Sequence, residues 1–191
     1  MEKSFYSEEE LPLLGLGGYG ENVLISRRAQ IYSPDKLYLG DHVRIDDFCV
    51  ISSSGGVDIG NYVHIAPFCG LYGGAGILMR DFSALSSRVA LYSVSDDFSG
   101  LSLVGPTVPN QYRLGLKSGK ITLDKFVVAG TGATIMPGVT AEIGSAIGAY
   151  SLVTESCDEW SIYSGNPAKK VCPRNKQLLN LEKTIKSEPD D

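Results

Sequence analysis

The sequence predicts an all-β fold in which the chain winds into a narrow triangular prism, with three short flat strands in each coil. Two repeating positions in each six-residue unit, which we call registers, predict this fold: the residue that opens the unit and the residue four positions later. In each six-residue unit the residue four positions after the opening one is small or β-branched, as at Val43, Cys49 and Ser83. An amphipathic helix would repeat every three to four residues and a half-buried strand every two, so a period of six fits neither. The fifteen opening residues are all apolar: Leu39, Ile45, Ile51, Ile59, Ile65, Leu71, Met79, Leu85, Leu91, Leu123, Ala129, Ile135, Ala141, Ile147 and Val153.

The corners of the prism carry residues suited to tight turns. Glycine with Asp or Asn recurs in "LGDH" and "IGNY", where positive φ is cheap. The first coils repeat every 20 residues instead of 18, because "SSSGGV" and "LYGGAG" each add two residues at one corner. Cys49 and Cys69 then occupy equivalent inward positions in successive coils, which predicts a packing role for both thiols.

The periodicity divides the chain into three parts. Ser7 and Glu10 have the spacing of a capping box, which predicts a short helix in an N-terminal cap. Pro173 is expected to begin a C-terminal helix that runs to about Lys186, with an apolar face made by Leu178, Leu179, Leu181 and Ile185. The predicted parts are a cap over 1–30, the coils over 31–172 and a helical tail over 173–191.

One segment inside the coils, residues 96–120, contains no six-residue unit. It is too long for a simple connection, and long loops that leave a regular scaffold often bind substrates. We therefore expect an excursion that contacts the substrate.

Composition excludes several classes of function. The formal net charge of −5 argues against a nucleic-acid partner, which normally needs a basic face. Two histidines cannot supply a three-histidine site, and the four cysteines show no CxxC spacing, so no metal is expected. The N-terminal stretch has only a short apolar run preceded by acids, which is neither a signal peptide nor a membrane span. We therefore expect a cytoplasmic protein with no integral membrane segment.

The motifs "MPGVT", "IGAYSLVT" and "GNPAKKV" resemble the hexapeptide-repeat acyltransferases, in particular the galactoside and maltose type of sugar O-acetyltransferase. The resemblance covers roughly residues 20–172. It implies a left-handed parallel β-helix, acetyl-CoA as acyl donor, and a homotrimer with active sites between subunits. The excursion sequence "SVSDDFSGLSLVGPTVP" looks most like enzymes of polysaccharide and O-antigen acetylation.

The resemblance also places the expected catalytic groups. Where the galactoside-type relatives carry a histidine base, this chain has Asp96, and an aspartate of ordinary pKa is a poor base for an alcohol. His64 is the expected replacement, because the neighbouring Ala66 matches an acceptor-contacting asparagine of the relatives. We expect His64 of one chain to pair with Asp96 or Asp97 of a neighbouring chain, which would fix the imidazole tautomer. The alternative is a solvent-exposed corner histidine. Asp46 is expected to be a solvated corner residue.

Cofactor positions follow from the same resemblance. Thr131 and Ala149 match residues that contact the pantetheine arm, and Thr154 follows at the next corner. Lys169 matches a basic residue for the CoA phosphates, whereas a second basic position falls on Cys172. These residues have a plain structural alternative, since any β-helix needs small residues at its corners. In the excursion, Tyr112 and Arg113 are candidates for holding a sugar or its phosphate.

The expected function is acetyl-CoA-dependent O-acetylation of a sugar hydroxyl, by direct transfer with His64 as general base. One alternative is N-acetylation of a nucleotide-linked amino sugar, because an amine brings its own lone pair and demands less of a base. Another is a non-catalytic β-helix scaffold. The long excursion and "GNPAKKV" argue against the scaffold.

Overall fold

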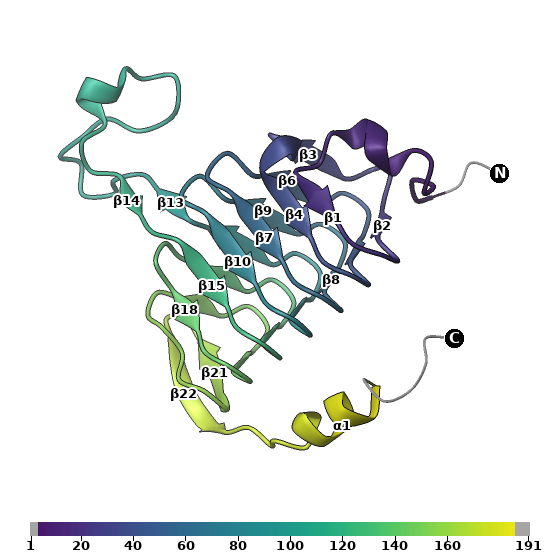
Figure 1. Cartoon of the computed structure of the whole chain (residues 1–191). Helices are drawn as coiled ribbons and strands as arrows, with labels where there is room; N and C mark the ends of the chain where they lie inside the picture. The colour runs from purple at the N-terminus through teal and green to yellow at the C-terminus, as the bar shows by residue number, and fades with distance from the viewer. Residues whose placement is uncertain (1–3, 186–191) are drawn as a thin grey trace.

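The computed structural model describes residues 4–185, and it shows a parallel β-solenoid with a projecting excursion and one C-terminal helix (Figure 1). Successive coils hydrogen-bond through three parallel sheets, one on each side of the prism. We call the turn from the first to the second sheet the first corner, the turn from the second to the third sheet the second corner, and the turn back to the first sheet the third corner. The prediction of a coiled all-β fold is confirmed.

The strands are short, and strands of successive coils lie side by side in each sheet. The first sheet contains β1 (Gly18–Tyr19), β4 (Leu37–Leu39), β7 (Val57–Ile59), β10 (Ile77–Met79), β15 (Ile121–Leu123) and β18 (Thr140–Ala141). The second contains β2 (Leu24–Ile25), β5 (Arg44–Ile45), β8 (His64–Ile65), β11 (Ala84–Leu85), β16 (Val128–Ala129), β19 (Ala146–Ile147), β21 (Ser161–Gly165) and, antiparallel at its end, β22 (Ala168–Pro173). The third contains β3 (Gln30–Tyr32), β6 (Val50–Ser52), β9 (Gly70–Tyr72), β12 (Ala90–Tyr92), β17 (Thr134–Ile135) and β20 (Leu152–Val153).

The predicted apolar register forms the core. All fifteen opening residues are buried, and most of their side chains exclude solvent completely. Burying one Ile or Leu contributes about 1.5–3 kcal/mol, so these stacked side chains are the main favourable term in folding. The second register holds except at the third corner of three coils, where Gly55, Ala75 and Ser95 are not buried. There the inward position lies two residues earlier, at Ser53, Gly73 and Ser93.

The N-terminal cap is smaller than expected. It contains a 3-10 helix, η1 (Leu11–Leu14), and only half of the capping box forms: the Ser7 amide donates to Glu10 Oε2 at 2.8 Å. The coils begin at β1, before the boundary at residue 31 that the repeats suggested. A second 3-10 turn, η2 (Pro34–Lys36), lies at the third corner of the first coil.

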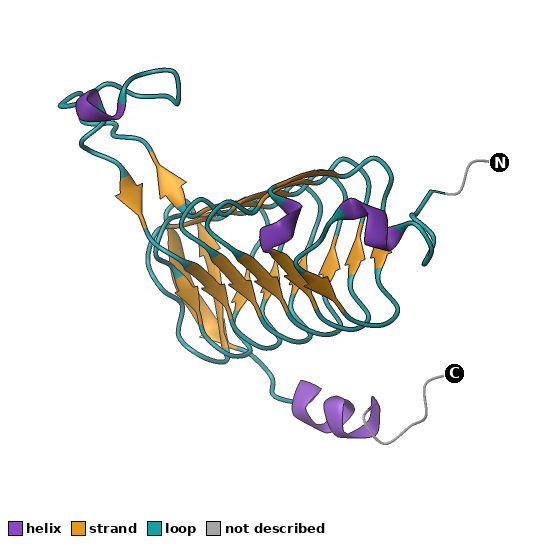
Figure 2. Cartoon of the chain, turned by 45° about the horizontal axis from the view of Figure 1, so that its top comes forward, coloured by secondary structure: helices purple, strands orange, loops and turns teal. Residues whose placement is uncertain are grey.

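The C-terminal tail differs from the prediction. Pro173 ends β22 instead of beginning a helix, because the chain first returns along β21 as an antiparallel hairpin. The helix α1 (Leu178–Ile185) follows and lies beside the solenoid (Figure 2). Leu178, Leu181 and Ile185 face a hollow of about 310 Å³ that Phe82 and Phe126 also line. The expected end near Lys186 lies outside the described residues.

The excursion leaves the prism at the third corner as an antiparallel pair, β13 (Val94–Ser95) with β14 (Lys117–Ser118), and its outer part holds the 3-10 turn η3 (Asn110–Tyr112). It projects away from the coils (Figures 1 and 2). The ladder below it is unbroken, since β10 pairs directly with β15 in the register Ile77↔Ile121. Within residues 4–185, no helix has the length and apolar character needed to cross a lipid bilayer.

Candidate active site

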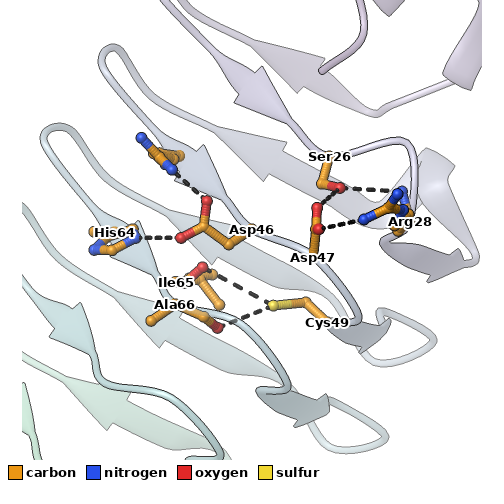
Figure 3. Close-up of polar contacts among 9 residues, drawn as sticks. Ser26, Arg28, Asp46, Asp47, Cys49, His64, Ile65 and Ala66 are labelled. Atoms are coloured by element: carbon orange, nitrogen blue, oxygen red, sulfur yellow. Dashed lines mark hydrogen bonds and ion pairs between the residues drawn. The ribbon is translucent and has the colours of Figure 1, made fainter. Parts of the chain in front are cut away.

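His64 lies on the outer face of the second sheet, in register with Arg44 of the preceding coil and Ala84 of the next. Its ring is half exposed, and Nε2 lies 2.8 Å from Oδ2 of Asp46 (Figure 3). The imidazole is therefore both accessible to a ligand and held by a carboxylate of its own chain.

Asp46 binds two partners at once. Its carboxyl is only 10% exposed, and Arg44 Nε donates to Oδ1 at 2.7 Å while His64 occupies Oδ2. Burial alone would raise the pKa of Asp46, but the hydrogen bonds from His64 and Arg44 outweigh it and hold the pKa below its ordinary value. An ionised Asp46 can only accept a hydrogen bond, so the proton of the neutral imidazole lies on Nε2. Nδ1 is then the nitrogen that carries the free lone pair.

This pairing differs from the sequence prediction, which placed Asp96 or Asp97 of a neighbouring chain beside His64 and Asp46 in solvent. The signal for Asp46 was available. Arg44 is in register with His64, and Asp46 stands two positions after Arg44, so it lies on the same side of the strand. Asp46 is the functional candidate that the sequence analysis missed.

Asp96 stands at the base of the excursion, at the third corner. Arg113 Nη2 lies 3.5 Å from Asp96 Oδ1, and that oxygen is buried without a hydrogen-bond partner among the described residues. Within one chain, this carboxylate and His64 belong to different corners of the prism and do not meet. Arg113 is mostly buried, whereas Tyr112 is exposed on η3.

Asp97 has a structural position in the excursion. Its carboxylate accepts hydrogen bonds from the backbone amides of Ser99, Leu101 and Ser102. The bond from the Ser99 amide, followed by the bond from the Ser99 hydroxyl and those from the other amides, lowers the pKa of Asp97 to about 2. These contacts use the carboxylate to hold the loop, so Asp96 is the one of the two whose oxygen remains without a hydrogen bond.

The expected cofactor residues lie at the second corner, on later coils than His64. Thr131 donates its hydroxyl to the Ser87 carbonyl at 3.0 Å, and its own carbonyl accepts the Tyr150 amide at 2.8 Å. Ala149 is exposed on the next coil, where a side chain on Gly130 would lie 2.6 Å from the Ala149 amide nitrogen. The backbones of successive coils are therefore in close contact here, and only glycine fits at position 130.

The remaining expected contacts are more dispersed. Thr154 is exposed one corner further along the chain, and Lys169 lies on β22 with its ammonium 3.9 Å from Glu155. Ala66 is buried, with its carbonyl 3.2 Å from the Cys49 thiol (Figure 3). In residues 4–185, no three His, Cys, Asp or Glu side chains are grouped as metal ligands would be.

Comparison with known proteins places this geometry among acyltransferases. No family model matches the chain. The dTDP-4-amino-4,6-dideoxy-D-glucose acyltransferase of Escherichia coli is 39% identical over 184 residues, which is 96% of this chain and 95% of that enzyme. A structure of AntD, an N-acyltransferase from Bacillus cereus, in complex with dTDP and 3-hydroxybutyryl-CoA is 48% identical, with a TM-score of 0.93 and 96% of each chain covered.

Two further comparisons are informative. Other AntD structures are variants of one serine and of one aspartate that stand ten residues apart, and they contain coenzyme A with dTDP or with dTDP-4-amino-4,6-dideoxyglucose. A maltose O-acetyltransferase from Clostridium difficile is 20% identical with a TM-score of 0.57, over 88% of this chain and 75% of that one, and shows the shared fold only.

These findings overturn the expectation of O-acetylation of a sugar hydroxyl in polysaccharide or O-antigen biosynthesis. The proteins matched over nearly the whole chain are, by name, an amino-sugar acyltransferase and an N-acyltransferase. The six-residue motifs led to the wrong acceptor group, because they specify the coils and a CoA groove, and O- and N-acyltransferases share both. The sequence does depart from the O-acetyltransferase pattern at Asp96, where those relatives are expected to carry a histidine.

Proposed function

The chain belongs to the hexapeptide-repeat acyltransferases, and on that premise we propose that it transfers an acyl group from acyl-CoA to the amino group of a nucleotide-linked amino sugar. The proposed acceptor is dTDP-4-amino-4,6-dideoxyglucose or a close analogue. The observation that carries the proposal is the match to the Escherichia coli and Bacillus cereus enzymes along almost the entire length, excursion included.

The reaction requires little covalent chemistry from the protein. The amine lone pair attacks the thioester carbonyl, the tetrahedral oxyanion collapses, and the C–S bond breaks to release the CoA thiolate. One proton leaves the nitrogen as the amide forms, and the thiolate gains one to become the thiol. The protein must accept the first proton, hold the oxyanion and align the two substrates.

The His64–Asp46 pair suits the role of proton acceptor. Asp46 holds Nε2, and its negative charge stabilises the imidazolium that forms when Nδ1 takes the proton of the amine. His64 is half exposed and needs no rearrangement to reach a ligand. This assignment keeps the predicted base and replaces its predicted partner.

Asp96 is the second proposed catalytic group, acting from the excursion of a neighbouring copy. Ser86 and Asp96 have the spacing of the substituted serine and aspartate of AntD, as do Ser87 and Asp97. We favour Ser86 with Asp96, because the carboxylate of Asp97 is occupied by loop amides. A carboxylate near the reacting nitrogen would accept a hydrogen bond from its N–H group and so turn the nitrogen lone pair toward the thioester carbonyl.

With this placement we propose a homotrimer with sites between copies. The excursion exposes large apolar side chains that a solvated loop does not need, including Phe98 at 91% and Leu101 at 92%. Packing against another copy would cover them and bring Asp96 to the second corner. Tyr112 of the excursion would then line the acceptor side with the mostly buried Arg113 behind it, whereas Ala66 of the neighbour is buried and would not itself reach the acceptor.

For the donor, we propose that the pantetheine arm follows the second corner past Thr131 and Ala149 toward Thr154. Lys169 on β22 would contact the CoA phosphates. Ala149 is small and exposed at this corner, which leaves room for an extended arm beside it.

The test is a direct assay with dTDP-4-amino-4,6-dideoxyglucose and either acetyl-CoA or 3-hydroxybutyryl-CoA, in which thiol release and product mass are measured. We expect a product heavier by one acyl group and a kcat/KM at least about a hundredfold above that for dTDP-glucose, which has a hydroxyl at the reacting carbon. Equal rates with the two sugars, or no thiol release with either donor, would refute the proposal.

A further inference from the structure

The second corner carries a column of side chains that the donor and the catalytic pair do not account for. Four residues at equivalent positions of successive coils stack along the solenoid axis: Arg28, Phe48, Phe68 and Arg88. The Arg28 guanidinium lies 5.8 Å from the Phe48 ring, the two phenyl rings are 5.1 Å apart at an angle of 18°, and the Arg88 guanidinium lies 5.4 Å from the Phe68 ring. We call this set the Arg–Phe column.

A purely structural stack is also present in the molecule and looks different. At the first corner His42, Tyr62, Phe82, Phe126 and Trp160 stack in the same way. That stack ends in buried rings, with Phe126 only 5% and Trp160 only 7% exposed. In the Arg–Phe column, Phe48 is 49% and Phe68 is 51% exposed. Stacking between coils therefore does not explain why these rings remain open to solvent.

Only one of the two guanidinium groups of the column is paired with a carboxylate of the described residues. Arg28 pairs with Asp47 at 3.0 Å (Figure 3), whereas Arg88 forms no ion pair with any carboxylate of residues 4–185. A cation held over an aromatic ring and free of an acidic partner is suited to phosphate oxygens. Exposed phenyl rings beside it are suited to a planar base, since any nucleobase can stack on an aromatic ring.

The position of the column indicates which substrate it would serve. On the next coils the same corner continues as Gly132 and Tyr150, directly beside Thr131 and Ala149, where the donor is proposed to lie. His64 lies on the coil of Phe68 and is in register with Ala84 on the coil of Arg88, so the reacting groups would meet beside the Arg88 end of the column, which is the end nearer the donor. The half of the corner that remains for the acceptor is the one that carries the Arg–Phe column.

We propose that the Arg–Phe column binds the nucleoside diphosphate half of the acceptor. This inference rests on the proposed function. The pyrimidine base packs against Phe48 and Phe68, and the diphosphate contacts Arg88, with Arg28 at the far end. A second copy of the chain could cover exposed rings as well, but a protein surface gives no reason for the unpaired guanidinium, whereas a diphosphate does.

The experiment is calorimetric titration of dTDP into the full chain and into Phe68→Leu and Arg88→Gln. Leucine keeps apolar bulk without a flat ring, and glutamine keeps length without charge. We expect each substitution to raise the Kd for dTDP by about tenfold or more and to leave the Kd for coenzyme A unchanged.

The matched controls are Tyr62→Leu and Arg80→Gln, which are expected to leave the Kd for dTDP unchanged. Tyr62 has the same left-handed backbone as Phe68, with φ of 56° against 66°, and stacks at the first corner. Arg80 is a surface cation that pairs with Asp124.

Four outcomes would contradict the inference. If the wild-type chain binds dTDP and both column variants bind it equally well, the column is not the nucleotide site, although the proposed function stands. If the variants lose coenzyme A to the same extent, the column serves the donor. If light scattering shows that they change the mass of the assembly, the column is a contact between copies. If the wild-type chain binds coenzyme A but no dTDP, the proposed acceptor is itself wrong.

Discussion

Replacing Asp46 by asparagine tests the assignment of the proton acceptor most directly. The substitution preserves the shape of the side chain but removes the charge that faces His64 Nε2 at 2.8 Å and Arg44 Nε at 2.7 Å. A hydrogen bond to a charged group is worth about 1.5–3 kcal/mol, and every 1.36 kcal/mol of barrier is a factor of ten. Loss of this support for the imidazolium should therefore lower kcat by about ten- to a hundredfold.

The KM values should change little, because Asp46 does not itself reach the ligand side of the imidazole. The assay is thiol release with the amino-sugar nucleotide and acyl-CoA, with kcat and both KM values measured at constant pH. Asp41→Asn is the matched control: its carboxylate bonds the Glu21 amide of the preceding coil at 2.8 Å, at the first corner. A kcat for Asp46→Asn within about twofold of the control would show that the carboxylate does not support the base.

Three further changes have defined outcomes. His64→Ala should lower kcat by about a hundredfold while the calorimetric Kd for coenzyme A is retained; a kcat within threefold of wild type would assign the proton to another group. The pKa of Asp97 is about 2, below its ordinary value, so its carboxylate should stabilise the excursion above about pH 4 and lose that effect as the pH falls through 2. Hydrogen exchange of the Leu101 amide should then be faster in Asp97→Asn than in wild type at pH 7, and the difference should narrow as the pH falls toward 2; equal exchange at pH 7 would contradict this. Ile65→Ala should reduce the free energy of unfolding by about 2–5 kcal/mol in denaturant titration, because the side chain is fully buried; a loss below about 1 kcal/mol would mean that the core relaxes around it.

The coils could be predicted from sequence because each depends on a local rule repeated many times. An aliphatic residue every sixth position must point inward if neighbouring coils are to bury one another, and all fifteen such residues do. The companion rule, that the small residue four positions later is also buried, failed where inserted residues move the buried position from Gly55 to Ser53. Pro173 was misassigned because a hairpin between β21 and β22 depends on pairing that no local pattern records.

The candidate site was predicted less completely, for two physical reasons. His64 was chosen from the resemblance at Ala66 and stays a prediction, but the group beside it depends on the register between coils, which brings Asp46 to it across 18 residues of chain. The six-residue repeats specify the coils and leave the nature of the acceptor open, because O- and N-acyltransferases share this fold. The motifs of the fold therefore predicted the acyl donor but not the acceptor.

The direct pairing of β10 with β15 has a practical consequence for engineering this scaffold. Residues 77–79 and 121–123 are as well matched as any two neighbouring strands of the stack, although the excursion intervenes. Since closing a loop costs only about 0.6 kcal/mol more for each doubling of its length, this junction can accept inserts of very different size. The segment between Ser93 and Gly119 can thus be exchanged for its counterpart from another acyltransferase, since the Gly119 amide already donates to the Ser93 carbonyl at 2.9 Å. Such an exchange is a route to new acceptor selectivity that leaves the proposed donor site unaltered.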